Sequence, residues 1–363
     1  MPRAALACEP FGTAPGGETV HRWTLRSPSG VTAEVLTYGA TLHSLLVPDA
    51  EGRPDDVVLG LPGMEQYAAE QPFLGAVVGR FGNRIAQGRF VLDGTPHQVP
   101  ATDRGHALHG GPEGFHRRVW QARPGPAADG GPVSLALDLH SPDGDMGFPG
   151  ALDVTVTYAL DADGTLAVDY RARTDRATVV NLTHHAYFNL AGAGSGDVLG
   201  HVLALDAASY LPVDEESIPL GPEAPTAGTP FDFAAPRPVG GRIAEDDPQL
   251  TAAGGYDHCY VLDPADAPGA LRRAVRVSEP GSGRSMAVWT TEPGLQLYTG
   301  NNLDGSHSGA HGKPYGRHSG VCFETQHFPD APNRPGYPST VLRPGEEFTS
   351  RTEFRFPHLL PQD

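Results

Sequence analysis

The distribution of glycine and proline constrains the fold of this chain more than any other feature. The 363 residues include 46 glycines and 36 prolines, scattered between short apolar runs instead of gathered in tracts. Both residues favour turns, so this spacing is typical of a folded chain that reverses direction often. No segment keeps a helical apolar period over a dozen residues. The sequence therefore predicts a mainly β protein with few short helices, one of them a brief turn within residues 66–71.

Several segments alternate apolar and polar residues, as strands of antiparallel sheets do. Residues 21–48 contain two such segments joined through the turn 27–30, and residues 285–300 resemble another hairpin, which would position Gln296. Three further segments, separated by turns that favour an antiparallel meander, are residues 133–139, 152–158 and 165–172. Because no linker, repeat or composition break divides the chain, we expect one domain, residues 1–363, built as a large antiparallel β-sandwich.

The composition excludes several classes of function. The formal net charge of −17, from 26 basic and 43 acidic residues, argues against nucleic acid or an anionic membrane as a partner. Lys313 is the one lysine of the sequence and stands in a loop-like run, so Schiff-base and pyridoxal phosphate chemistry are set aside. A neutral small molecule suits this charge balance better.

The cysteines and the N-terminal segment bear on the cellular compartment. Cys8, Cys259 and Cys322 are widely spaced and form no C-x-x-C pair, which gives neither a disulfide framework nor a thiolate zinc site. The first residues lack the apolar stretch of a signal peptide, and no run of 18 apolar residues occurs. We therefore expect a cytoplasmic protein in a reducing compartment.

Residues 320–333 carry one carboxylate in a reactive position. The apolar run 321–323 has strand character, and Glu324 follows it directly. Pro329 and Pro332 then end the regular structure. A pairing of Glu324 with an arginine would be the ordinary structural explanation. The other polar groups near strand ends favour a sugar-binding site instead.

Histidines gather in two stretches. The turn-rich segment 101–119 carries His106, His109 and His116, and a long polar loop of this kind usually has a function. His106 and His109 could be metal ligands, but their spacing means little without a helical pattern. His184 and His185 are neighbours on an expected strand, so they face opposite sides and only one can reach a given pocket.

Two more segments place polar side chains among glycines or at a strand start. Residues 75–92 set glycines around Asn83 and Arg84, without the spacing or the following helix of a dinucleotide-binding loop. Asp257 and His258 stand at the start of the strand expected in residues 255–262.

Several motifs occur together and in order between about residues 38 and 348: YGATLHSLLVPD, GRFGNRIAQGRF, LHGG, NLTHHAYFNLAG, LPVDEESIP, GTPFDF, GYDHCYVL, PGLQLYTGNNLDG and ETQHFPDAPN. In this set the chain resembles the aldose 1-epimerase (galactose mutarotase) family. The resemblance implies an antiparallel β-supersandwich that interconverts the α and β anomers of free aldoses such as galactose or glucose. It implies Glu324 as the catalytic base and His185 as the catalytic acid. The sugar-hydroxyl contacts that it implies are Asn83, Arg84, His109, Asp257 and Gln296.

The chain departs from the family pattern at two positions. Gly82 stands where alanine usually precedes the Asn-Arg-Ile sequence, and His184 stands where asparagine commonly precedes the catalytic histidine. The second departure leaves either histidine open as the acid. The following residues 187–189, Tyr-Phe-Asn, support His185.

The expected reaction needs no cofactor and no metal. Opening a cyclic aldose requires a base at the C1 hydroxyl and an acid at the ring oxygen, which one carboxylate and one imidazole can supply. Partial burial should raise the pKa of Glu324, and His185 should be protonated near neutrality without much tuning. These assignments predict a bell-shaped pH profile with Glu324 on its acid limb and His185 on its alkaline limb.

Three alternatives stay open at the level of sequence. A non-catalytic sugar sensor could share the fold. A hexose-phosphate epimerase-like enzyme would gather arginines at the site, for which Arg104, Arg117 and Arg118 are candidates. A histidine-metal hydrolase or cupin-like enzyme is disfavoured because no HxH or HExxH occurs. The sequence leaves the preferred aldose open, and it fits a monomer or a homodimer.

Overall fold

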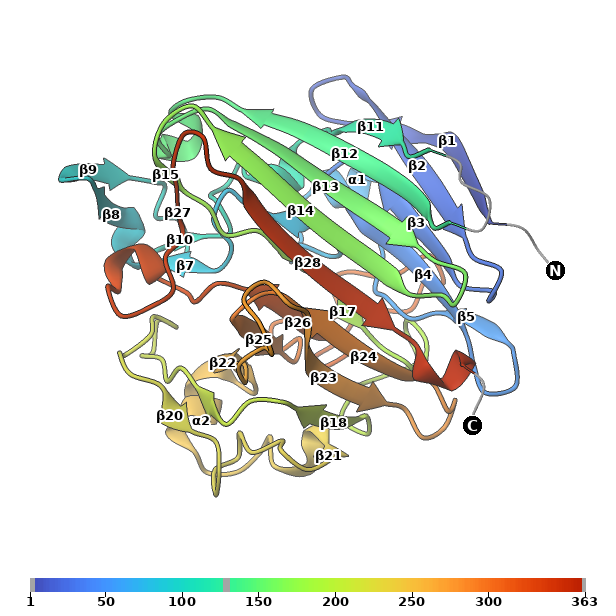
Figure 1. The fold of residues 1–363 in the computed structure, drawn as a ribbon. Helices are drawn as coiled ribbons and strands as arrows, with labels where there is room; N and C mark the ends of the chain where they lie inside the picture. The colour runs from blue at the N-terminus through green and yellow to red at the C-terminus, as the bar shows by residue number, and fades with distance from the viewer. Residues whose placement is uncertain (1–3, 127–130, 361–363) are drawn as a thin grey trace.

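The computed structural model describes residues 4–126 and 131–360, and strands dominate it (Figure 1). The α-helices of these residues are short: α1 (Met64–Ala68) and α2 (Pro248–Ala253). Helix α1 overlaps the turn expected in residues 66–71. The predicted mainly β fold is confirmed. In the described part of the chain, no helix is long and apolar enough to cross a membrane.

A nine-stranded antiparallel sheet forms the largest layer. In spatial order its strands are β11 (Gln121–Pro124), β12 (Val133–Ser141), β13 (Leu152–Leu160), β14 (Leu166–Thr174), β28 (Phe348–Arg355), β24 (Ser285–Thr290), β23 (Arg272–Ser278), β18 (Val202–Leu205) and β21 (Arg237–Pro238). Strands β12, β13 and β14 are the predicted meander. The turn between β13 and β14 is closed by Asp161, whose side chain accepts the Thr165 amide at 2.8 Å, and by Gly164 at φ 91°.

A second, six-stranded sheet carries the chemistry. Its order is β17 (Tyr187–Phe188), β26 (Val321–Gln326), β25 (Gly294–Tyr298), β22 (Asp257–Val261), β19 (Ser209–Tyr210) and β20 (Ala224–Pro225). The hairpin predicted for residues 285–300 is wrong, because β24 pairs with β23 and β28 whereas β25 pairs with β22 and β26. The chain therefore passes from one sheet to the other at residues 291–293. All of β25 is buried, and so is most of β24. Gln296 still lies on a strand, β25.

A five-stranded N-terminal sheet and four small ladders complete the fold. The sheet contains β1 (Ala5–Thr13), β2 (Thr19–Arg26), β3 (Thr32–Leu36), β4 (Leu42–Pro48) and β5 (Pro54–Asp56). It includes the hairpin predicted through the turn 27–30. The ladders are β6 (Val77–Val78) with β16 (Thr183–His184), β7 (Arg84–Ile85) with β10 (Ala107–Leu108), β8 (Arg89–Leu92) with β9 (Thr95–Gln98), and β15 (Thr178–Val179) with β27 (Val341–Leu342).

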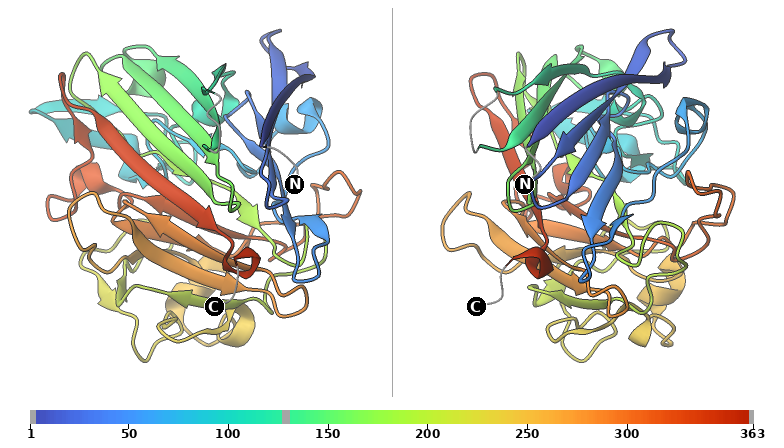
Figure 2. Two further views of the ribbon diagram at one scale, coloured as in Figure 1. Left: turned by 45° about the vertical axis from the view of Figure 1, so that its right-hand side comes forward. Right: turned by 90° about the vertical axis from the view of Figure 1, so that its right-hand side faces the viewer.

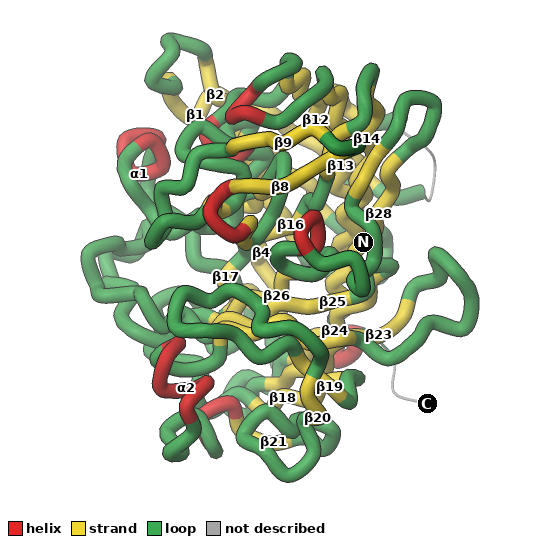
Figure 3. Tube along the Cα trace, turned by 90° about the vertical axis from the view of Figure 1, so that its left-hand side faces the viewer, coloured by secondary structure: helices red, strands yellow, loops and turns green. Residues whose placement is uncertain are grey.

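Packing between the sheets decides which side chains of β26 face the site. Phe323 belongs to the main apolar core, and the Thr325 hydroxyl lies 2.6 Å from that of Thr352 on β28. Since side chains alternate along a strand, Cys322 and Glu324 face the opposite way. Figure 2 shows the N-terminal and nine-stranded sheets as separate layers, and Figure 3 shows β16, β17 and β26 near the middle of a view framed by loops. The core face holds β26 rigidly while its other face lines a pocket.

Candidate active site

A pocket of about 120 Å³ lies over the outward face of β26. Its lining brings together residues from distant parts of the chain: Pro72, Phe73, Asn83, Arg84, Leu108, His109, His185, Tyr187, Asp257, Tyr298, Asn302 and Glu324. Every site residue predicted from the sequence lies in this lining except Gln296. Gln296 is buried directly behind it, and its Nε2 donates to Asp257 Oδ1 at 2.7 Å.

Glu324 and His185 face each other across the pocket. Glu324 lies on β26 and His185 directly follows β16, and His185 Nε2 is 3.7 Å from Glu324 Oε1. The His185 backbone is fixed on both sides, because its N–H donates to Ala76 and its carbonyl accepts from Gly75. Glu324 Oε2 is buried and has no protein partner. An acid and a base are therefore placed together, with one carboxylate oxygen free to meet a ligand.

Burial shifts the pKa values of Glu324 and His185 in opposite directions. Burial raises the pKa of Glu324 well above its usual value; nearby Asp257 adds to the shift, and Arg84 opposes it. Burial lowers the pKa of His185 to about 4, against a hydrogen bond with its own backbone. The expectation for Glu324 is met in direction, but the expectation that His185 is protonated near neutrality without tuning is wrong. Because the groups are so close, they titrate as a pair that holds one proton over a wide pH range.

His184 lies on the other side of its strand, in the core. Its Nε2 is 2.8 Å from the Tyr158 hydroxyl, and its ring meets Phe354 edge-on at 6.3 Å. Burial lowers the pKa of His184 to about 3, so this imidazole is neutral. The strand register therefore puts His185, and not His184, in the pocket.

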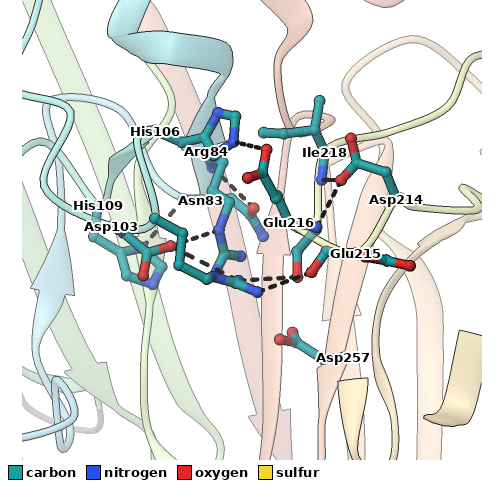
Figure 4. Close-up of polar contacts among 12 residues, drawn as sticks. Asn83, Arg84, Asp103, His106, His109, Asp214, Glu215, Glu216, Ile218 and Asp257 are labelled. Carbon is teal, nitrogen blue, oxygen red and sulfur yellow. Dashed lines mark hydrogen bonds and ion pairs between the residues drawn. The ribbon is translucent and has the colours of Figure 1, made fainter. Parts of the chain in front are cut away.

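Asn83 reaches the pocket from the turn before β7, and Arg84 reaches it from the start of β7. Asn83 adopts a left-handed backbone (φ 59°), which asparagine tolerates better than most residues, and its Oδ1 accepts the Arg84 amide at 2.9 Å. Arg84 Nε donates to Asp103 Oδ2 at 2.9 Å, which anchors the guanidinium beside Asp257 (Figure 4). The remaining Arg84 donors can bind sugar hydroxyls.

His109 is fixed as a hydrogen-bond donor. Its Nδ1 accepts the Asn83 amide at 3.1 Å, so the neutral ring carries its proton on Nε2. Burial lowers the pKa of His109 well below its usual value, and the neighbouring charges of His185 and Arg84 lower it further. His109, also at positive φ (51°), can therefore donate to a sugar oxygen at any ordinary pH.

The same tautomer bears on metal binding. One ligand atom each of His109, His185 and Glu324 lie within 4.8 Å of one another, a donor set that could surround a cation. However, His109 Nε2 carries a proton and offers no lone pair unless the bond from Asn83 is given up. His106, the other candidate ligand, accepts from the Gln87 amide at Nδ1 and lies 2.8 Å from Glu216 Oε2 at Nε2. The histidine arrangement thus suits hydrogen bonding better than metal ligation.

Six lining residues were not anticipated from the sequence: Pro72, Phe73, Leu108, Tyr187, Tyr298 and Asn302. The Phe73 ring lies 4.6 Å from the His109 ring and 5.7 Å from the His185 ring, between centroids. Strand alternation could have found Tyr187, two residues beyond His185, and Tyr298, two beyond Gln296. Phe73 has no such signal, because it lies in an irregular segment at φ 57°.

A loop across residues 213–219 borders the pocket (Figure 4). Arg104 holds this loop by donating to the Glu215 carbonyl at 3.1 Å and to the Ser217 hydroxyl at 3.2 Å. Arg117 binds the Ala68 carbonyl, and Arg118 binds Asp145 at 2.7 Å. None of these arginines lines the pocket. The cluster expected of a phosphate-binding enzyme is therefore not formed by them.

The antiparallel sheets place a carboxylate and an imidazole face to face in one pocket, an arrangement suited to acid/base chemistry. A family model described as aldose 1-epimerase matches residues 21–355. The chain belongs to the aldose 1-epimerase family, which confirms the resemblance seen in its motifs.

Individual relatives agree over nearly the whole chain. The chain is 44% identical to galactose mutarotase of Rattus norvegicus, over 95% of this chain and 97% of the relative. It is 39% identical to aldose 1-epimerase of Escherichia coli K12, over 94% of this chain and 97% of that relative. The crystal structure of galactose 1-epimerase from Lactobacillus acidophilus is similar with a TM-score of 0.85 and 30% identity, covering 98% of this chain and 99% of that one.

Proposed function

We propose that this protein interconverts the α and β anomers of a free aldose, with Glu324 as the base and His185 as the acid. The observation that carries the proposal is the 3.7 Å approach of these two buried groups in a pocket of this fold. The residues proposed to hold the sugar hydroxyls are Asn83, Arg84, His109, Asp257 and Gln296.

The proton balance of the reaction matches the pair. Glu324 removes the proton of the C1 hydroxyl while protonated His185 gives one to the ring oxygen, so the C1–O5 bond breaks and an aldehyde forms. The pair starts as carboxylate and imidazolium and ends as carboxylic acid and imidazole, with one proton throughout. Burial raises the pKa of Glu324 and lowers that of His185, so it favours the carboxylic acid and imidazole, the state that the pair reaches when the ring opens. Rotation about C1–C2 and the reverse transfer then give the other anomer.

A neutral sugar fits the electrostatics of the site better than a sugar phosphate. Two carboxyl groups, Glu324 and Asp257, line the pocket, and acidic Glu215 and Glu216 belong to the bordering loop. The one arginine of the lining, Arg84, is already paired with Asp103. A dianion would meet these carboxyl groups with a single arginine of the lining, already paired at Nε, to offset them.

Exchange NMR on freshly dissolved α-galactose, α-glucose and α-xylose, with glucose 6-phosphate and galactose 6-phosphate as matched anions, tests the proposal. We expect the protein to speed anomer exchange strongly for the free sugars and only weakly for the sugar phosphates. Free-sugar exchange at the uncatalysed rate with tight binding would instead establish a sensor. A preference for the phosphates would establish the hexose-phosphate enzyme.

A further inference from the structure

The second ring nitrogen of His185 has a partner that the proposed reaction does not use. His185 Nε2 faces Glu324, whereas its Nδ1 lies 3.6 Å from Cys322 Sγ. Cys322 is fully buried on β26, where it pairs with Tyr187 of β17 and Tyr298 of β25. The thiol is therefore fixed by strands on both sides, two residues before the proposed base.

The chemistry of the contact follows from the protonation of both groups. Burial raises the pKa of the Cys322 thiol well above its usual value, and the carboxyls of Glu324 and Asp257 raise it further. The sulfur thus stays a neutral, weak acceptor. In the proposed reaction Nε2 gives up its proton to the ring oxygen, so Nδ1 keeps the other proton in both catalytic states and faces Cys322 Sγ as the donor. A carboxylate in place of the thiol would stabilise the imidazolium much more strongly.

We propose that Cys322 is a positioning residue, which accepts the Nδ1–H of His185 and so aims Nε2 at Glu324 and the ring oxygen of the sugar. This inference rests on the proposed function, because it assigns a partner to the proposed acid. A weak acceptor leaves the imidazolium a strong acid, which favours proton delivery to a poorly basic ring oxygen.

Cys259 provides a matched control within the same sheet. It is also buried, on β22, and its Sγ lies 3.8 Å from the Tyr260 carbonyl without contacting His185. A cavity made at either cysteine destabilises the protein in the same way. Only the change at Cys322 should alter the titration of His185.

The test compares Cys322→Ala, Cys322→Ser and Cys259→Ala by kinetics and by pH titration of ¹⁵N-histidine NMR signals. The titratable groups near His185 must be assigned or held constant: Glu324, His109, His116, His184, Tyr187 and Tyr298. We expect Cys322→Ala to lower kcat roughly tenfold with KM little changed, within the range of acid/base effects. Cys322→Ser, with a stronger oxygen acceptor, should raise the pKa of His185 and move the acid limb of kcat to higher pH.

Two results would contradict the inference. Unchanged kcat, acid limb and Nδ1 tautomer in both Cys322 variants would overturn the inference, and so would an equal titration shift in Cys259→Ala. If Cys322→Ala does not fold, Cys322→Ser alone supplies the titration shift that decides. If the wild type fails to speed anomer exchange, the proposed function falls, while the NMR titration still reports whether Cys322 holds the ring.

Discussion

Adjacent histidines on opposite faces of one strand allow a prediction that separates catalysis from stability. His185→Asn should fold and bind sugar but lose about 10² to 10⁴ in kcat, since asparagine keeps a hydrogen bond and cannot move a proton. That loss equals about 3 to 5 kcal/mol of transition-state stabilisation. His184→Asn should keep its kcat, because His184 lies in the core beside Phe354.

The cost of His184→Asn should appear in the free energy of unfolding. The imidazole contact with the Tyr158 hydroxyl, at 2.8 Å, is lost, while that hydroxyl still donates to the Ala40 carbonyl at 2.6 Å. Tyr158 therefore keeps its main partner, and we expect His184→Asn to lower the free energy of unfolding by about 1 to 3 kcal/mol. Polarimetric kcat and urea unfolding, measured on both variants, give the two numbers. Loss of kcat in His184→Asn with a tolerated His185→Asn would refute the strand register.

The remaining predictions concern protons and ions. The pH profile of kcat should be bell-shaped, with the acid limb from a second proton on the pair (pKa of His185 lowered to about 4) and the alkaline limb from loss of its last proton (pKa of Glu324 raised). This assignment of the two limbs is the reverse of the one expected from the sequence. Asp257→Asn should move the alkaline limb to lower pH, because Asp257 raises the pKa of Glu324. An unmoved limb would contradict this influence of Asp257 on Glu324. The unfolding free energy should fall as the pH drops below about 6.5, by up to about 1.4 kcal/mol per pH unit for each histidine buried as the neutral form, because the unfolded chain then binds more protons. Urea unfolding between pH 7 and pH 4.5 checks this for the residues whose pKa is lowered to about 3: His116, His184 and His258. Exhaustive chelation should leave kcat unchanged, and activity lost and then restored by a divalent ion would rule out the metal-free account.

The sequence predicted the fold where local signals decide it. Strand alternation and turn residues located the meander β12–β14 and the first hairpin. They could not show that β24 and β25 belong to different sheets, because alternation reports a strand and not its partner. The partner depends on burial of both faces, which only the assembled layers define.

The site was predictable to a similar extent. Motif resemblance named six of the residues that line the pocket and Gln296 behind it, and strand alternation predicted that only one of His184 and His185 enters it. The direction of the pKa shift of His185 was missed, since burial on every side of a ring is not visible in the sequence. Phe73, which contacts His185 from a remote irregular segment, carries no signal of its own, whereas strand alternation could have placed Cys322 on the face of Glu324.

The most direct test of the central claim is the rate of anomer exchange catalysed by Glu324→Gln, measured by exchange NMR on α-galactose beside the wild type. Glutamine preserves the shape of the buried side chain and its contact with His185, but it cannot take the C1 proton. We predict a variant that folds, still binds sugar and loses about 10² to 10⁴ in kcat. Near-normal exchange by a folded Glu324→Gln protein would contradict the mechanism.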